Sequence, residues 1–258
     1  MLIHRPPARA LSPLVSVLWH AEAWKPPHRR ERRMPDGCAG IVISLDPASP
    51  FTIFAGPSSE SVILDIGAAP DVIMGAHFTP GGAAAFIQCS VSDVRNASVS
   101  LIDVTDSSAV ILAERLLECR TAAARLALLE RWLMSRLMRS ATSDQTVLWA
   151  ARQLKYPQTR VADVTSQIGH SSRWFINRFA EEVGLTPKVF SRVQRFQAAL
   201  RFARRPAVLS LGEVALAAGY FDQAHLTHEF KAIAGMPPTA VLAGRTGAIN
   251  HVVDLESA

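Results

Sequence analysis

Cysteine is scarce in this 258-residue sequence, and no hydrophobic run is long enough to cross a bilayer. The three cysteines, Cys38, Cys89 and Cys119, are widely spaced and odd in number, which favours reduced thiols over a disulfide framework. They are either buried or incidental thiols, or one of them is a redox sensor. A membrane span needs roughly 18 apolar residues, and the proline-containing N-terminus lacks the apolar core of a secretory signal. We therefore expect a cytoplasmic protein without membrane contact.

Metal-ligand spacing is also missing. No two cysteines have the separation of a zinc motif, and His4, His20, His28 and His77 stand alone. His225 and His228 are three residues apart but have no further ligands nearby. The sequence therefore predicts no metal, no cofactor and no catalytic residue, although strands distant in sequence can assemble ligands in a barrel.

Charge is sparse and unevenly distributed. Charged residues make up 19% of the chain and hydrophobic residues 49%, which is typical of a folded protein. The net charge is +5, with 8 Lys/Arg against 9 Asp/Glu in residues 1–105 and 13 against 9 in residues 141–258. The basic excess thus lies in the C-terminal part, as a domain that binds a polyanion requires.

Residues 1–105 are predicted to form a β-rich domain for sensing or dimerisation. Short β-branched or aromatic runs separated by Pro, Gly, Asp and Ser are typical of a small barrel or sandwich. These runs cover residues 14–19, 40–45, 51–54, 61–66 and 72–78. A cluster of arginines at 29–33 is expected in a solvated loop, with a DNA or partner contact as the alternative.

Residues 106–140 are predicted to be linker helices. Leucine and valine recur at helical spacing between Arg and Glu, and Thr121 is the expected start of the second helix. Such a pair can pack on its own β domain or form a dimer interface. The sequence favours neither arrangement.

Residues 141–245 contain one pattern twice, at 164–187 and at 214–238. Each copy has a helix, a glycine turn, a capped second helix, a glycine stop and a proline start, which indicates two helix-turn-helix units. After a one-residue insertion, the matched positions are Val164 and Val214, Gly169 and Gly219, Phe175 and Leu226, Phe179 and Phe230, Gly184 and Gly235, and Pro187 and Pro238.

The helix between the two units is expected to run from Pro187 to about Arg205, where Pro206 breaks it. At about 1.5 Å per residue it would span nearly 30 Å. This length is close to one turn of DNA, so the second helices of the two units can enter successive major-groove segments on one face of the duplex. A preceding helix begins at Ser143 or Asp144, and residues 246–258 are predicted to be a flexible tail.

The second helix of each unit begins at an N-cap, Ser171 or Asp222, and has an apolar face opposite an outward face. Arginine can bind guanine bidentately, asparagine and glutamine can bind adenine, and small apolar groups can contact the thymine methyl. The predicted base-reading candidates are Arg173, Asn177, Gln223 and His228, and the same outward face includes Ser172, Ile176, Ala224 and Thr227. Six basic residues are predicted to be phosphate partners or solvated charges: Arg178, Lys188, Arg192, Arg195, Arg201 and Lys231.

These motifs resemble a known family. Residues 143–243 are similar to the double helix-turn-helix domain of the AraC/XylS bacterial transcription regulators, and Ala215–Lys231 followed by Gly235–Pro238 carries the signature. The first unit departs from it, because Val164-Thr165 stands where the family usually has Leu-Ala. Pro35–Cys38 and Phe78–Phe86 resemble the small β domain that precedes this module in one subgroup, which implies an effector or oligomerisation role.

The resemblance implies an α+β chain with an N-terminal cupin-like β-barrel or sandwich, a helical linker and an all-α DNA-binding domain. The expected function is sequence-specific regulation of transcription. The expected partners are double-stranded promoter DNA, RNA polymerase, a small-molecule effector and a second copy in a homodimer. One alternative is a metal-dependent cupin-like enzyme fused to a DNA-binding module, with His20, Glu22 and His77 as ligands. Another is an architectural DNA-binding protein without a small ligand.

Overall fold

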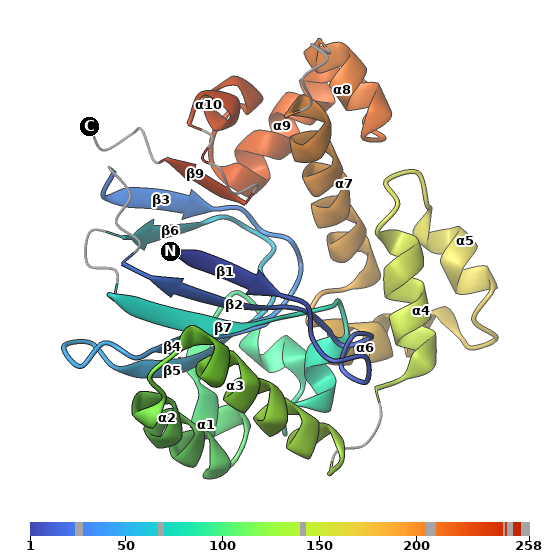
Figure 1. The fold of residues 1–258 in the computed structure, drawn as a ribbon. Coiled ribbons are helices and arrows are strands. Elements are labelled where there is room, and N and C mark those ends of the chain that lie inside the picture. Colours follow the sequence, from blue (N-terminus) through green and yellow to red (C-terminus); the bar gives the residue numbers. More distant parts are fainter. Residues whose placement is uncertain are drawn as a thin grey trace.

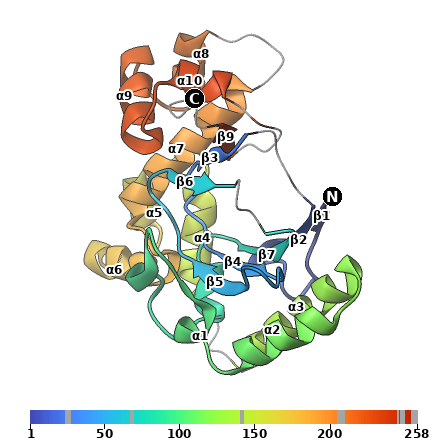
Figure 2. The same ribbon diagram turned by 90° about the vertical axis from the view of Figure 1, so that its left-hand side faces the viewer.

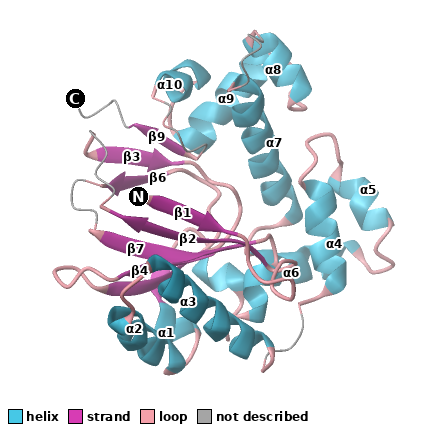
Figure 3. Ribbon diagram, in the orientation of Figure 1, coloured by secondary structure: helices cyan, strands magenta, loops and turns pink. Residues whose placement is uncertain are grey.

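The computed structural model describes residues 1–23, 28–66, 70–139, 143–204, 210–244, 246 and 250–253. Strands gather in one half of the molecule, and the helices of the C-terminal region lie along the other side and the top (Figure 1, Figure 3). Among the described helices, none is long and apolar enough to cross a membrane.

The larger sheet has six strands in the order β1-β2-β7-β4-β5-β8, with every neighbouring pair antiparallel. Its strands are β1 (Leu2–Arg5), β2 (Val15–Glu22), β7 (Val72–Phe78), β4 (Gly40–Ser44), β5 (Phe51–Ala55) and β8 (Ser98–Ser100). Because β1 and β8 lie at opposite edges, the described strands form an open sheet and not the closed barrel that was one form of the prediction. The α+β class is confirmed.

The smaller sheet has the order β6-β3-β9 and pairs two strands of the N-terminal domain with a strand near the C-terminus. It consists of β6 (Val62–Asp65), β3 (Arg30–Arg33) and β9 (His251–Val253). Two predictions were wrong here. The arginine cluster is a strand and not a loop, because Glu31 points inward between its arginines and is 1% exposed. Part of the predicted flexible tail pairs with β3, and Val252 is fully buried; residues 254–258 lie outside the described part.

The helices that come between β7 and residue 139 pack on the larger sheet. They are the short η1 (Gly82–Ala85), η2 (Val91–Val94) and α1 (Leu101–Val104), then α2 (Ser108–Glu118) and α3 (Ala122–Leu137). Thr121 caps α3, as predicted, and accepts a hydrogen bond from the Ala124 N–H. Leu126, Leu129 and Leu133 of α3 join the main core with the residues of β2 and β7. The structure thus realises the arrangement in which the pair covers its own sheet.

The C-terminal helices form two apolar clusters that share one long helix. They are α4 (Gln145–Leu154), α5 (Val161–Ser166), α6 (Ser172–Val183), α7 (Pro187–Ala203), α8 (Leu211–Ala217), α9 (Gln223–Ala234) and α10 (Pro238–Ala243). Phe190, near the start of α7, packs with α4 and α6, whereas Phe196, farther along, packs with α8 and α9. One helix therefore holds both clusters. The break predicted at Pro206 lies outside the described residues.

Candidate DNA-binding surface

The first helix-turn-helix unit consists of α5, a turn at Gly169 and α6. Gly169 has φ +70°, a left-handed conformation that favours glycine, and a Cβ there would meet nothing within 4 Å. Backbone conformation alone therefore selects the glycine. Ser171 caps α6 by accepting from the Trp174 N–H, and Gly184 ends the helix with φ +81°.

The second unit repeats this geometry with α8, Gly219 and α9. Asp222 caps α9 by accepting from the His225 N–H at 2.7 Å, and Gly235 ends the helix with φ +75°. Leu226, Phe230 and Ile233 face inward and are at most 1% exposed. The internal repeat seen in the sequence is thus also a repeat of caps, turns and stops.

On α6, the predicted outward face reaches solvent. Ser172, Arg173, Ile176 and Asn177 are all exposed, while Phe175 and Phe179 of the same helix are fully buried. Among the described residues, neither Arg173 nor Asn177 has a side-chain hydrogen bond or ion pair. Both side chains are free to bind another molecule.

On α9, the five predicted contact residues line one shallow hollow of about 530 Å³: Gln223, Ala224, Thr227, His228 and Lys231. The Thr227 hydroxyl donates to the Gln223 carbonyl at 2.8 Å, so its methyl group is the part that remains for recognition. Gln223 and His228 have no side-chain partner within the described part of the chain. The face thus combines an amide, an imidazole and a cation around small apolar groups.

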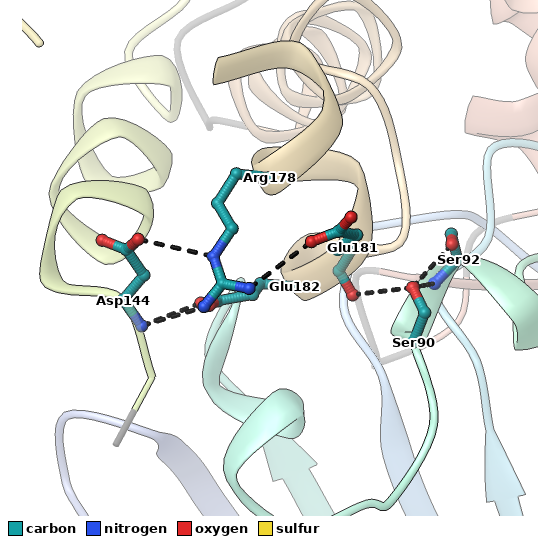
Figure 4. Close-up of polar contacts among 6 residues, drawn as sticks. All are labelled: Ser90, Ser92, Asp144, Arg178, Glu181 and Glu182. Atoms are coloured by element: carbon teal, nitrogen blue, oxygen red, sulfur yellow. Dashed lines mark hydrogen bonds and ion pairs between the residues drawn. The ribbon is translucent and has the colours of Figure 1, made fainter. Parts of the chain in front are cut away.

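Two of the predicted phosphate partners are engaged inside the protein, Arg178 (Figure 4) and Arg192. Arg178 forms ion pairs with Glu182 at 2.6 Å and with Asp144 and Glu181, both at 3.4 Å. Arg192 on α7 binds Glu229 on α9 at 2.7 Å. These arginines therefore hold α6 and α9 in place. Lys188 and Lys231 are exposed, and neither has an ion pair with another described residue.

Burial disfavours the charged forms of the carboxyl groups around Arg178. Glu182 is 5% exposed, and burial raises the pKa of its carboxyl although Asp144 N–H and Arg178 stabilise the charged form. Burial opposes ionisation of Asp144 as well, yet its hydrogen bonds with Thr146 and its ion pair with Arg178 lower its pKa overall. Removal of Arg178 would leave the carboxylates of Asp144, Glu181 and Glu182 close together without a balancing cation.

The two outward-facing helices occupy the same side of the molecule, one near each end of α7 (Figure 2). Both are bonded to the β-rich part at their C-terminal ends. The Ser90 hydroxyl donates to the Glu181 carbonyl of α6 at 3.2 Å, and the Ser61 N–H donates to the Ile233 carbonyl of α9 at 2.8 Å. Their N-terminal ends, which carry the exposed residues, point away from these attachments.

One exposed residue beside this surface was missed in the sequence. Phe221, immediately before the Asp222 cap, is 85% exposed. An aromatic side chain at the start of an outward-facing helix is visible in the sequence, but only the turn geometry shows that it leaves the core.

The ligand set of the alternative enzyme does not assemble. Strand pairing places Val17 opposite His77 and His20 opposite Met74, so the two histidines project from opposite faces of the sheet. His20 is fully buried, and burial lowers its pKa. Its Nε2 lies 3.3 Å from Arg125. A site that joins His20, Glu22 and His77 is incompatible with this register.

Two family models match separate parts of the chain. Residues 164–244 match a family described as a helix-turn-helix domain, which covers both units. Residues 3–100 match a family described as a domain of unknown function (DUF6597). A comparison with curated proteins finds no match.

Several solved structures of ToxT from Vibrio cholerae are similar over most of their length. One at 1.65 Å resolution is 10% identical, covers 96% of this chain and 98% of that chain, and has a TM-score of 0.44. Another, bound to an unsaturated fatty acid, is 9% identical over 90% of this chain and 95% of that chain, with a TM-score of 0.41. A third, bound to (E)-4-(8-methylnaphthalen-1-yl)but-3-enoic acid, is 10% identical over 92% and 95%, with a TM-score of 0.39. No ligand or residue role is transferred at this distance.

Proposed function

We propose that this DNA-binding transcription regulator, whose helix-turn-helix domain is of the AraC type, reads promoter DNA by inserting α6 and α9 into successive major-groove segments. The observation that carries the proposal is the repeated geometry of the two helices. Each begins at a capped, exposed N-terminus with hydrogen-bonding side chains free of protein partners, and each is fixed at its other end. This is the arrangement that a recognition helix requires.

The separation of the two helices suits a duplex. The 17 residues of α7 span roughly 25 Å at 1.5 Å per residue. One turn of DNA is about 34 Å, so helices beyond the two ends of α7 can reach neighbouring major-groove segments on one face. The contacts of α7 with both clusters keep this separation fixed.

The chemistry of the free side chains separates base readers from phosphate partners. Arg173 can donate two hydrogen bonds to guanine, and Asn177 and Gln223 can each bind adenine in a bidentate manner. His228 lies beside Thr227, whose methyl can contact thymine. Lys188 and Lys231 supply charge for phosphates. Arg178 and Arg192 form ion pairs that hold α6 and α9 to neighbouring helices, and they are not proposed as DNA contacts.

We further propose that the β-rich domain controls this surface through an effector, in a homodimer or alone, and that the DNA-bound protein acts on RNA polymerase in the cytoplasm. The physical support is the direct bonding of that domain to α6, α7 and α9. A metabolite screen by thermal shift tests the effector, because a ligand that binds the folded state raises its melting temperature. If no metabolite alters either melting or DNA binding, the protein acts as an architectural DNA binder.

The DNA-reading proposal is tested with the sequence selected by the protein from a random pool of duplexes. In gel-shift titrations on that sequence, Arg173→Ala and Gln223→Ala should each weaken binding by about 1–3 kcal/mol and relax the preference at one position. Arg131→Ala, which removes an exposed arginine of α3, outside the DNA-binding helices, serves as the control. Unchanged affinity and preference in both test variants would remove these assignments.

A further inference from the structure

Three potential metal ligands meet at the junction of the β domain and the C-terminal helices. Asp36 and Cys38 lie in the loop between β3 and β4, and His77 lies on β7. Their ligand atoms all fall within 4.8 Å of one another. The side chains of His77 and Asp36 are 37% and 24% exposed, so the cluster remains accessible to small solutes.

Local backbone geometry holds the three residues together. The Cys38 N–H donates to Asp36 Oδ1 at 2.9 Å across a turn in which Gly37 has φ +73°. The register of β4 and β7 then places Gly40 opposite His77, and the Phe78 N–H donates to the Ala39 carbonyl at 3.0 Å. The loop is thus clamped to the strand that carries the histidine.

The hydrogen bonds of His77 turn its Nε2 toward Asp36. The Ser16 hydroxyl donates to the His77 carbonyl at 2.9 Å and lies 3.3 Å from His77 Nδ1. Because the single hydroxyl hydrogen is used, Ser16 can only accept from Nδ1–H. Nε2 then lies 3.0 Å from Asp36 Oδ2. A proton on Nε2 makes this contact an ion pair, and a metal ion can take the place of that proton.

We propose that Asp36, Cys38 and His77 bind one zinc ion, with water in the fourth position. Zinc bonds of 2.0–2.3 Å in a tetrahedron separate neighbouring ligand atoms by about 3.3–3.7 Å. The carboxylate and the imidazole, now 3.0 Å apart, must therefore separate by a few tenths of an ångström, and Cys38 Sγ, which lies within 4.8 Å of both, must take up the same spacing. The bond from Nδ1–H to Ser16 is the outer-shell contact that zinc-bound histidines commonly make.

Two further outer contacts of this site come from the C-terminal part of the chain. Gln194 of α7 donates to the Asp36 carbonyl at 2.7 Å, and Asn250 donates to Asp36 Oδ2 at 3.3 Å. The zinc site does not depend on the proposed DNA binding, because its ligands all lie in the β domain. Its place in the fold nevertheless connects it directly to the helix that joins the two helix-turn-helix units.

Cobalt titration of the full chain tests the proposal, after treatment with a chelator and under a non-thiol reductant. Co²⁺ should bind at one equivalent per chain and give thiolate-to-metal charge-transfer absorption with the visible bands of tetrahedral cobalt, and Zn²⁺ should displace it. Cys38→Ser should abolish the charge-transfer band, and His77→Gln should weaken binding about 10-fold or more. Cys119→Ser, which removes a partly buried thiol that donates to the Arg115 carbonyl and lies outside the three-residue cluster, is the matched control.

Circular dichroism and thermal melting of each apo variant show whether it folds. If Cys38→Ser does not fold, the cobalt affinity of His77→Gln is the test of the site. A charge-transfer band that persists in Cys38→Ser, or its loss in Cys119→Ser, would overturn the assignment. So would weak binding of cobalt without a one-to-one end point.

Discussion

Arg136 shows how much one buried cation can organise. It is 7% exposed, donates from Nε to the Phe86 carbonyl at 2.9 Å, and forms an ion pair with Asp106 at 2.8 Å. Its guanidinium also lies over the Trp132 ring, 5.1 Å from the centroid. Asp106 meanwhile accepts from the Ser108 N–H at 2.9 Å, so one carboxylate serves both the start of α2 and the arginine of α3.

This carboxylate should make stability depend on pH. Its hydrogen bond with Ser108, followed by those with Arg136, lowers the pKa of Asp106 from 3.8 to about 2. A carboxyl whose pKa is lower in the folded state stabilises that state fully above pH 4, and the contribution is lost as pH falls toward 2. Because the side chain is 39% exposed, we expect solvent to reduce the effect to about 1 kcal/mol.

Asp106→Asn should therefore lower the free energy of unfolding by about 1 kcal/mol at pH 7, and the difference from the wild type should shrink between pH 4 and pH 2. Urea denaturation at a series of pH values measures this. Asp103→Asn, at an exposed carboxyl of α1, is the control and should show no such trend. A constant difference across the series would mean that the Asp106 charge is not responsible.

Gly219 permits a second residue-scale prediction. Its φ is +82°, and an added Cβ would lie 2.9 Å from the Pro157 carbonyl oxygen. Gly219→Ala should lower the free energy of unfolding by about 1–3 kcal/mol, measured by urea denaturation. Gly212→Ala is the matched control, because its Cβ would meet only Ser210 Oγ at 3.9 Å. Equal effects of the two substitutions would contradict the geometric argument.

At the residue scale, the sequence predicts which side chains of the recognition helices are exposed, but not which arginines form ion pairs within the protein. The exposure of Arg173 and Asn177 follows from helical periodicity, because their neighbours Phe175 and Phe179 mark the buried face. Glu182, four residues beyond Arg178, was a visible i,i+4 partner. The Arg192–Glu229 pair spans two helices, so the sequence alone could not separate it from a phosphate contact. The base contacts of Arg173, Asn177, Gln223 and His228 remain predictions.

At the scale of elements, periodicity predicts helices better than it predicts lone strands. The caps at Ser171 and Asp222, the stops at Gly184 and Gly235 and the start at Pro187 were all readable because local chemistry determines them. Strand β9 has only three residues, and its pairing partner lies more than 200 positions earlier. A short strand stabilised by such a distant partner carries no local signal.

The burial of β9 can be measured directly. Val252 is fully buried beside Met34, whereas Val253, the next residue of the strand, is partly exposed. Val252→Ala should cost about 1.5–3 kcal/mol of stability in thermal or urea unfolding. Val253→Ala should cost clearly less, although both changes reduce β propensity equally. Similar losses would indicate that β9 contributes through its backbone pairing alone.

At the scale of the whole molecule, the β domain is bonded to α6, α7 and α9 of the proposed DNA reader. It is bonded to the C-terminal ends of α6 and α9, and Pro35 and Asp36 accept from Gln197 and Gln194 of α7, both at 2.7 Å. Local sequence patterns predict the two halves but not this interface, nor the meeting of Asp36 and Cys38 with His77. Both depend on strand register and on contacts across more than 35 residues, for which hydrophobic pattern gives no information.

If this interface fixes the distance between the recognition helices, weakening it should make DNA binding less sensitive to the spacing of the two half-elements. Inserting about five base pairs, half a turn, between them should weaken wild-type binding about 10-fold or more in gel-shift titrations. Gln194→Ala/Gln197→Ala leaves two carbonyls of the β domain unpaired, so its loss on insertion should be smaller. Gln167→Ala, whose amide bonds only its own helix at Asp163, should behave like the wild type. Equal losses in all three proteins would mean that α7 alone sets the spacing.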